Sequence, residues 1–292
     1  MPWRASPRTN LYLLRTVSHA AAVSAVAFAT EGHELVSGAV DGSLLVTRDE
    51  SEPVTLSRSP GGIDAVSVLA DGRVIVADAS KRLRVIGADQ KTLLMDLSTP
   101  FRIRLLRPSP KGGRLVTIST ATEQVAPVLW DLDRYRPIAS LEGQAGRVFT
   151  ARFVTVDGGA EILTTGSDGT VHTWDAVTGR PRETFRGDSH FLVDAALSPD
   201  GSLIVAGSSD GVLRVWSRAS GRLLWRLRAH ASYVVGVHYE GDDLVTRGFA
   251  GDLARWVLPS PDSVIEACRI RSCAGTDTEK WLGESGRVII RR

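Results

Sequence analysis

The sequence predicts an all-β protein built from one repeated antiparallel unit, and three observations lead to this fold class. Apolar residues alternate with polar ones at a period of two, as they do in half-buried strands. Turn sequences of the Pro-Asp-Gly and Asp-Gly type interrupt these runs, which is typical of strands joined by hairpins. The unit returns about every 40–45 residues. The segment 185–218 shows the alternation and the turns, which lie at Ser198–Gly201 and Asp210–Gly211.

The repeat is clearest at the end of the third predicted strand of each unit, usually six residues after a turn position. The residues at this place are Thr47, Ile86, Trp130, Trp174, Trp216 and Trp256. Two of the tryptophans are followed by Asp, in Trp130-Asp131 and Trp174-Asp175. A period of about 40–45 residues with four strands per unit is the period of a propeller blade.

With these motifs the chain resembles the WD-repeat (WD40) β-propeller family over essentially its whole length. The resemblance implies a single domain, 1–292, that forms one WD40-type β-propeller. Both ends read as partial blades, so we expect seven four-stranded blades, the last one composed of residues 1–17 and about 276–292. Such a composite blade would remove the open sheet edges. The alternative is six blades closed by residues 11–17, with residues 263–292 as a tail.

In this family a His, a Ser or Thr, an Asp and the Trp form a buried hydrogen-bonded network in each blade. The resemblance gives a structural role to the residues His19, Asp41, Trp130, Asp131, Asp168, Trp174, Asp175, Asp210, Trp216, His230 and Trp256. No repeat has the full set. Gln144 and Asp188 stand at the His position of two repeats, and Ala250 stands at the Asp position of another. The repeats are therefore divergent.

Composition places the chain among ordinary globular proteins, with 292 residues, 43% of them hydrophobic and 23% charged. No apolar run approaches the roughly 20 residues that span a bilayer, and the N-terminus lacks a signal-peptide pattern, so we expect a cytoplasmic protein. Cys268 and Cys273 fit neither a disulfide framework nor a zinc site. The net charge of +2 does not by itself indicate nucleic-acid binding. Only four of the 35 basic residues are Lys, so 31 are Arg.

The sequence shows no constellation that carries catalytic chemistry. Its six His residues have no metal-ligand spacing, and there is neither a nucleophile elbow nor a phosphate-binding loop. The Asp-Gly pairs are typical of turns. We therefore predict that the protein is not an enzyme and has no metal site and no cofactor.

A partner-binding face is predicted from two positions that recur in each repeat. One lies three residues after the His position and the other directly before the Asp position, and in this fold both belong to loops that open on one face. At these positions repeats three to six carry Arg102, Arg147, Phe191, Tyr233 and Phe249. Arg and aromatic residues are enriched at interface hot spots, and this set would suit an acidic peptide or loop. The alternative is that Phe191 and Phe249 pack locally under the loops.

The resemblance implies a non-catalytic scaffold, adaptor or sensor for protein–protein interaction. Such propellers also occur in bacterial signalling and defence assemblies, and the Arg richness and repeat divergence favour that setting. One alternative is nucleic-acid or anionic-surface binding through an arginine-rich face made of Arg82, Arg84, Arg102, Arg104, Arg107 and Arg114. Another alternative is a small-ligand site at the mouth of the propeller channel.

Overall fold

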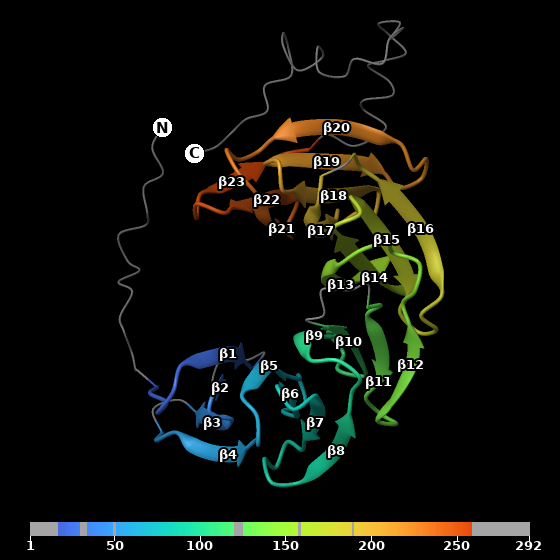
Figure 1. Cartoon of the computed structure of the whole chain (residues 1–292). Helices are drawn as coiled ribbons and strands as arrows, with labels where there is room; N and C mark the ends of the chain where they lie inside the picture. The colour runs from blue at the N-terminus through green and yellow to red at the C-terminus, as the bar shows by residue number, and fades with distance from the viewer. Residues whose placement is uncertain are drawn as a thin grey trace, which may run out of the picture. The chain divides into compact units, whose positions relative to one another are not determined.

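The computed structural model describes residues 17–29, 34–48, 51–119, 125–156, 159–188 and 190–258, drawn as the coloured ribbon in Figure 1. The regular structure in these ranges consists of strands, β1 to β23, which form antiparallel sheets. No helix in the same ranges is long and apolar enough to cross a membrane. The chain divides into two compact units, which we call the N-terminal unit (β1 to β12) and the C-terminal unit (β13 to β23).

The N-terminal unit contains three four-stranded sheets, in each of which the strands follow one another in chain order as a meander. Its strands are β1 (Val23–Phe28), β2 (Glu34–Ala39), β3 (Ser43–Arg48), β4 (Val54–Arg58), β5 (Ile63–Val68), β6 (Val74–Asp78), β7 (Arg82–Ile86), β8 (Leu93–Ser98), β9 (Ile103–Pro108), β10 (Arg114–Ser119), β11 (Val128–Asp131) and β12 (Arg136–Ser140). The first strands β1, β5 and β9 of successive sheets lie next to one another.

The C-terminal unit contains two four-stranded sheets and one three-stranded sheet with the same meander order. Its strands are β13 (Val148–Val156), β14 (Gly159–Gly166), β15 (Thr170–Asp175), β16 (Pro181–Arg186), β17 (Leu192–Leu197), β18 (Leu203–Ser208), β19 (Val212–Ser217), β20 (Leu223–Arg228), β21 (Val234–Glu240), β22 (Asp243–Gly248) and β23 (Leu253–Trp256). Here too the first strands, β13, β17 and β21, are neighbours.

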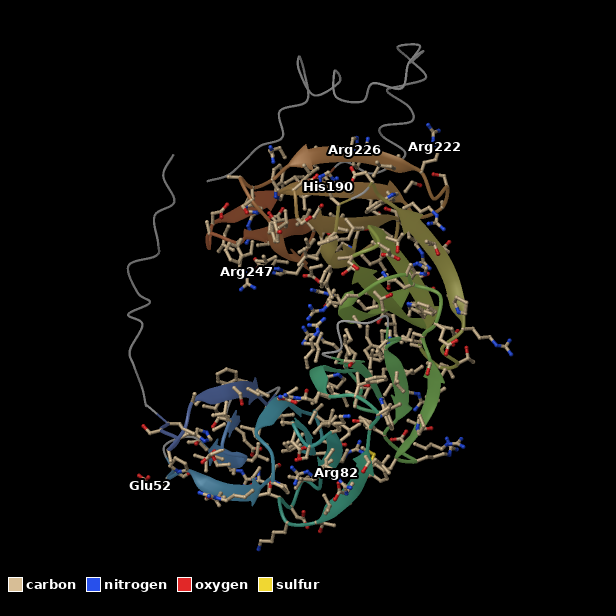
Figure 2. The ribbon with its side chains drawn as sticks, in the orientation of Figure 1. Glu52, Arg82, His190, Arg222, Arg226 and Arg247 are labelled. Atoms are coloured by element: carbon tan, nitrogen blue, oxygen red, sulfur yellow. The ribbon has the colours of Figure 1, made fainter. Side chains whose placement is uncertain are left out.

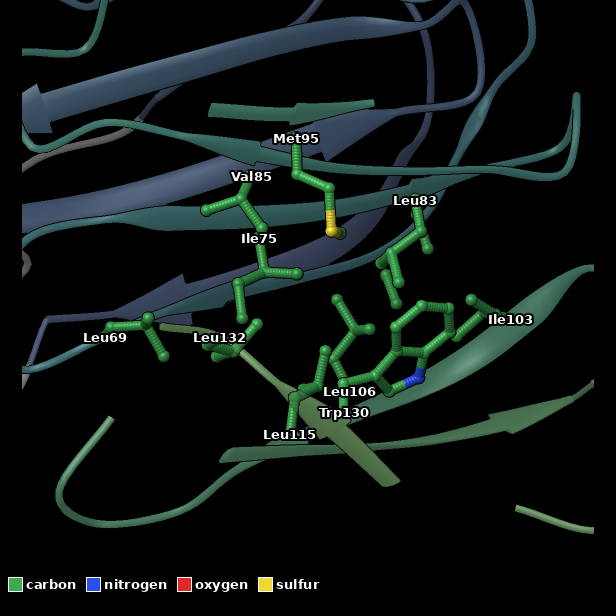
Figure 3. Close-up of a cluster of buried hydrophobic side chains, with 12 residues drawn as sticks. Leu69, Ile75, Leu83, Val85, Met95, Ile103, Leu106, Leu115, Trp130 and Leu132 are labelled. Atoms are coloured by element: carbon green, nitrogen blue, oxygen red, sulfur yellow. The ribbon is translucent and has the colours of Figure 1, made fainter. Parts of the chain in front are cut away.

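The core of each unit lies between the faces of successive sheets. Figure 3 shows the cluster between sheets β5–β8 and β9–β12, where Leu83 of β7 and Leu115 of β10 are fully buried and Trp130 of β11 packs among them. In the C-terminal unit Phe185 and Trp216 are buried with ring centroids 6.3 Å apart. Because strand side chains alternate between two faces, each strand can contribute to the core on either side of its sheet.

A β-bulge recurs at the second residue of the first strand in every sheet. The register skips Ser24, Asp64, Arg104, Phe149, Val193 and Val235, which are the second residues of β1, β5, β9, β13, β17 and β21. A bulge leaves its extra residue out of the ladder and re-aims its side chain. The start of each first strand is therefore a place where side chains point away from the regular pleat.

The predicted fold class is confirmed, because the described chain is all-β and consists of repeated antiparallel sheets of the β-propeller type. The composite closing blade (1–17 with 276–292) and the six-blade alternative fall on residues that lie, apart from residue 17, outside the described part. Cys268 and Cys273 lie there as well. Seven blades and a single domain remain predictions.

Candidate interaction surface

In five repeats the two recurring positions meet through one backbone hydrogen bond. The residue after the second strand donates its N–H to the carbonyl oxygen of the residue before the first strand. The pairs and their distances are Val40 to Ala22 (3.0 Å), Ala79 to Gly62 (2.8 Å), Ser167 to Arg147 (2.9 Å), Ser209 to Phe191 (2.9 Å) and Phe249 to Tyr233 (2.9 Å). In these sheets the fold therefore places both positions side by side at the same ends of the strands.

Aromatic side chains gather at this end of the C-terminal unit. The rings of Tyr233 and Phe249 are 6.3 Å apart, and those of Phe149 and Phe191 are 5.9 Å apart. Phe249 is 73% exposed, Tyr233 47% and Phe191 45%. Phe191 and Phe249 are thus in ring contacts, yet large parts of both remain open to solvent.

Two arginines accompany these rings. The Arg147 guanidinium carbon lies 5.9 Å from the centre of the Phe149 ring, a cation–π distance. Arg247, near the end of β22, is exposed and projects from its sheet in Figure 2. Among the described residues neither guanidinium has a carboxylate partner. We call the set Arg147, Phe149, Phe191, Tyr233, Arg247 and Phe249 the aromatic–arginine surface.

Arg102, the fifth residue of the predicted face, is placed differently. It belongs to the N-terminal unit. It forms a bidentate ion pair with Asp64, in which Arg102 Nε lies 2.8 Å from Asp64 Oδ2 and Arg102 Nη2 contacts Asp64 Oδ1. The hydrogen bond and the charge of Asp64 raise the pKa of the Arg102 guanidinium. We therefore describe Arg102 with the N-terminal unit.

Two residues of the surface were missed by sequence reasoning. Phe149 is the bulged residue of β13, and a bulge without a glycine leaves no sequence signal. Arg247 stands two residues before Phe249, and the alternation of β22 could have indicated that it shares the outward direction.

Behind the surface, the sheet β21–β23 is tied by a network around a threonine hydroxyl. Thr246 Oγ1 accepts a hydrogen bond from Trp256 Nε1 at 3.0 Å and lies 2.9 Å from His230 Nε2. The other ring nitrogen, Nδ1, contacts the carboxylate of Asp252. The repeat pattern expected this carboxylate at position 250, which is Ala. Asp252, two residues further on, supplies it instead.

The sheet β13–β16 builds the same network with a glutamine. The Thr164 hydroxyl donates to Gln144 Oε1 at 2.7 Å and accepts from Trp174 Nε1 at 2.9 Å. Gln144 Nε2 donates to the Thr170 carbonyl at 3.2 Å and reaches Asp168 Oδ1 at 3.4 Å. An amide has both a donor and an acceptor, so Gln144 makes contacts that His230 makes elsewhere.

The remaining hydroxyl networks lie in the N-terminal unit. His19 lies 2.8 Å from Ser37 Oγ and 2.9 Å from Ser43 Oγ, and Ser43 donates to Asp41 at 2.6 Å. Trp130 Nε1 donates to Thr117 Oγ1 at 3.0 Å.

The aspartates that follow two of the tryptophans, one in each unit, stabilise turns. Asp131 Oδ1 accepts hydrogen bonds from the N–H groups of residues 133 and 134, and Asp175 Oδ1 accepts one from the N–H group of residue 177.

The sheet β17–β20 replaces the hydroxyl network with a buried arginine. Arg214 is 1% exposed, and its Nε donates to Asp188 at 3.2 Å while its Nη2 donates to Asp210 at 2.8 Å. Burial raises the pKa of both carboxyls, but hydrogen bonds from Arg214 and from neighbouring groups, together with the charge of Arg214, outweigh burial and hold both pKa values below the usual range. Trp216 Nε1 donates instead to the carbonyl of Arg186 at 3.1 Å.

Asp188, His190 and Asp210 offer ligand atoms within 4.8 Å of one another. Both carboxylates already have the Arg214 guanidinium as their counter-charge. A divalent cation bound there would lie beside a buried positive charge, so we assign no metal site to this cluster.

The arginines proposed for an anionic surface are largely engaged inside the N-terminal unit. Ion pairs join Arg82 to Asp96, Arg84 to Asp78, Arg102 to Asp64 and Arg114 to Asp131. A cation paired with an internal carboxylate contributes little net field toward a polyanion. These contacts favour the other surface as the interaction site.

Repeated four-stranded sheets tied by His or Gln, Thr and Trp define the class of WD-repeat propellers. The family model described as "WD domain, G-beta repeat" matches residues 11–47 and 179–217. The chain thus contains two segments that match the WD40 repeat, and the second matched segment runs from the residues before β16 to the end of β19. The comparison with curated proteins finds no match.

Proposed function

We propose that the protein is a non-catalytic scaffold or sensor that binds a protein partner through the aromatic–arginine surface. WD40 repeats support a protein-interaction role in general. The observation that carries the assignment to this surface is the pair of aromatic contacts with exposed rings, Tyr233 with Phe249 and Phe149 with Phe191. Next to them lie arginines that have no carboxylate partner among the described residues.

The exposure of these rings supports an interface. Exposed apolar groups that gather in one place, rather than singly, mark interaction sites, and aromatic and Arg side chains dominate hot spots. Burying a large apolar side chain contributes roughly 1.5–3 kcal/mol. Phe249, at 73% exposed, offers the most unburied area of the set.

The charge of the surface favours an acidic partner. Arg147 and Arg247 are exposed to solvent. A carboxylate on a partner peptide could form a bidentate ion pair with either guanidinium group. Charge complementarity of this kind speeds association and selects the partner. Binding should therefore weaken as salt rises.

The same proposal extends to the setting of the protein. A cytoplasmic platform within a bacterial signalling or defence assembly is consistent with the Arg-rich composition and with repeats that diverge from one another. The identity of the bound partner would show which pathway the protein belongs to.

The experiment is a pull-down from host lysate, with mass spectrometry, of the wild type and of the triple variant Arg147→Ala, Tyr233→Ala, Phe249→Ala. A matched control is Arg222→Ala with Val177→Ala, which removes an exposed arginine and an exposed apolar side chain from turns at the opposite ends of the strands. All three proteins must have the same melting temperature.

The proposal expects an acidic protein that the wild type and the control retain and the triple variant loses. Equal recovery by all three proteins would place the interaction elsewhere. Recovery of nucleic acid alone, with a steep salt dependence, would favour the anionic-surface alternative.

A further inference from the structure

One position on the second strand of each sheet sets the sheet β21–β23 apart. The residue at this position lies opposite the third residue of the first strand. The residues are Gly38, Ala77, Ile118, Thr165, Gly207 and Arg247. The first five are buried, whereas Arg247 is exposed. A charged side chain therefore stands on β22 where the other sheets bury an uncharged residue.

The glycines at this position lie close against the next sheet. A Cβ added to Gly38 would overlap with Ile63 of β5, and one added to Gly207 would overlap with Val234 of β21. Arg247 instead projects from its sheet in Figure 2. A guanidinium group does not fit such close apolar packing, so we expect a different kind of contact on this face of β21–β23.

Leu253 lies beside Arg247 on the same face. The two residues are opposite each other in the ladder of β22 and β23, and opposite residues of neighbouring strands have adjacent side chains. Leu253 is 70% exposed. Its counterparts in four other sheets are fully buried, and these are Leu44, Leu83, Val171 and Leu213. Arg247 and Leu253 thus offer a basic and an apolar side chain together to solvent.

Gly236 of β21 makes room for the Arg247 side chain. It lies opposite Arg247, and a Cβ there would be 3.6 Å from the Cβ and 3.7 Å from the Nε of Arg247. The arginine side chain therefore lies over the glycine. Longer side chains fit this strand position elsewhere, since Leu105 and Asp194 occupy it in β9 and β17. We call Gly236, Arg247 and Leu253 the β21–β23 row.

The charge of the row comes from Arg247, which has no carboxylate partner within the described ranges. Arg255 lies on the same face, but its guanidinium is 2.9 Å from Asp243 Oδ2 and also contacts Glu240. Phe249 follows two residues after Arg247, and residues two apart in a strand point to the same side. The row thus continues the aromatic–arginine surface onto the face of the sheet.

We propose that the β21–β23 row binds an acidic and apolar segment of the partner protein, with a carboxylate on Arg247 and an aliphatic side chain on Leu253. This inference rests on the proposed function, because it extends the same surface. A carboxylate forms a charge-assisted, bidentate pair with a guanidinium. Alternate side chains of an extended segment point to one side, so the acidic and the aliphatic residue of the partner stand two positions apart.

The probe is the capped peptide acetyl-Leu-Glu-Leu-Glu-Leu-amide, and its control is the same peptide with Gln in place of Glu. Titration of the full chain is followed by NMR at the Leu253 methyl groups, the Arg247 Nε–H and the rings of Tyr233 and Phe249. We expect saturable shifts with the Glu peptide and an affinity at least about tenfold weaker for the Gln peptide, since the charge-assisted pair is lost. Equal affinities of the two peptides would overturn the proposal.

Three variants test the row itself. Leu253→Ser and Arg247→Gln should each weaken the Glu peptide at least about tenfold. Gly236→Leu keeps the charge but displaces the guanidinium, and it should weaken binding as well. Unchanged binding in any of the three would contradict the proposal. The matched controls Val177→Ser and Arg222→Gln change an exposed apolar residue and an exposed arginine in connecting loops, and they should bind like the wild type.

The same spectra separate this inference from the proposed function. Shifts at Tyr233 and Phe249 without a change at Leu253 would overturn the row and leave the proposed function standing. Absence of shifts at both places would count against both. NOE contacts of the Leu253 methyl groups with residues 1–16 or 259–292 in the free protein would also overturn the inference, because the chain itself, through the predicted closing blade, would then occupy the row.

Discussion

Two neighbouring sheets of the C-terminal unit, β13–β16 and β17–β20, each bury a tryptophan but supply different hydrogen-bond partners around it. Each buries a tryptophan at the end of its third strand, Trp174 in one and Trp216 in the other. Four residues before the turn aspartate, the first has Thr164 and the second has Ala206. The hydroxyl gives Trp174 its acceptor, whereas Trp216 donates to a backbone carbonyl.

The difference continues two residues before each tryptophan. His172 stacks on Trp174, with ring centroids 5.6 Å apart, and burial lowers the pKa of this His. Arg214 at the matching place reaches Asp188 and Asp210 instead. The comparison teaches that the network is a set of exchangeable partners, and that losing the hydroxyl makes room for a buried ion pair.

The largest effect is expected from Arg214→Met, which breaks that ion pair. Removing one partner of a buried pair typically costs about 3–5 kcal/mol, because the remaining charges are left without compensation. Urea denaturation at neutral pH measures the loss. Arg222→Met, an exposed arginine in the turn after β19, should stay within about 0.5 kcal/mol of the wild type. Equal effects of the two substitutions would contradict the account.

Thr164→Val should cost less, about 1–3 kcal/mol, because it leaves the N–H of Trp174 without its acceptor and takes a hydroxyl from Gln144. The same denaturation measurement applies. Thr155→Val, an exposed position on the same sheet, is the matched control. If the two threonines respond alike, the hydroxyl does not hold the network.

The pH dependence of stability separates the two sheets further. The folded-state pKa values of Asp188 and Asp210 lie below the unfolded value of about 3.9. Their contribution is therefore full above that pH and is lost as the pH falls through the folded pKa values. Denaturation between neutral pH and pH 3 should show stability falling with acid in the wild type and a flatter profile in Arg214→Met. Parallel profiles would speak against the ion pair.

The smallest effect is expected from Gln144→His, which restores the residue found at His230 in β21–β23. Both side chains can bond Thr164 and the Asp168 region, so the free energy of unfolding should change by less than about 1 kcal/mol. Gln144→Leu, which has a similar size but no hydrogen-bonding group, should be clearly less stable. A His variant as unstable as the Leu variant would show that the two residues are not equivalent.

Much of the fold was predictable because it depends on local patterns. The Asp-Gly turns and alternating runs predicted outer strands such as Leu223–Leu227, which the structure places at Leu223–Arg228. The Trp positions gave the repeat. Such features need only the period of a strand and the backbone preferences of turn residues.

The networks and the surface were less predictable, because they depend on how far side chains reach in three dimensions. The carboxylate that pairs with His230 comes from Asp252 rather than from the position of Ala250. Nothing in the sequence indicated the role of Arg214, and the sequence predicted an outward arginine-rich face for Arg84, which the structure pairs with Asp78. Phe149 is the bulged residue of β13 and contacts Phe191, and Arg102 looked free although Asp64 engages it.

The most direct test of the central claim is amide hydrogen exchange of the wild type with and without its captured partner. The account predicts slower exchange in the partner complex at residues 145–149, 190–193, 231–235 and 247–251, which carry the aromatic–arginine surface. Protection confined to the outer strands β16 and β20, with no change in these four segments, would contradict it.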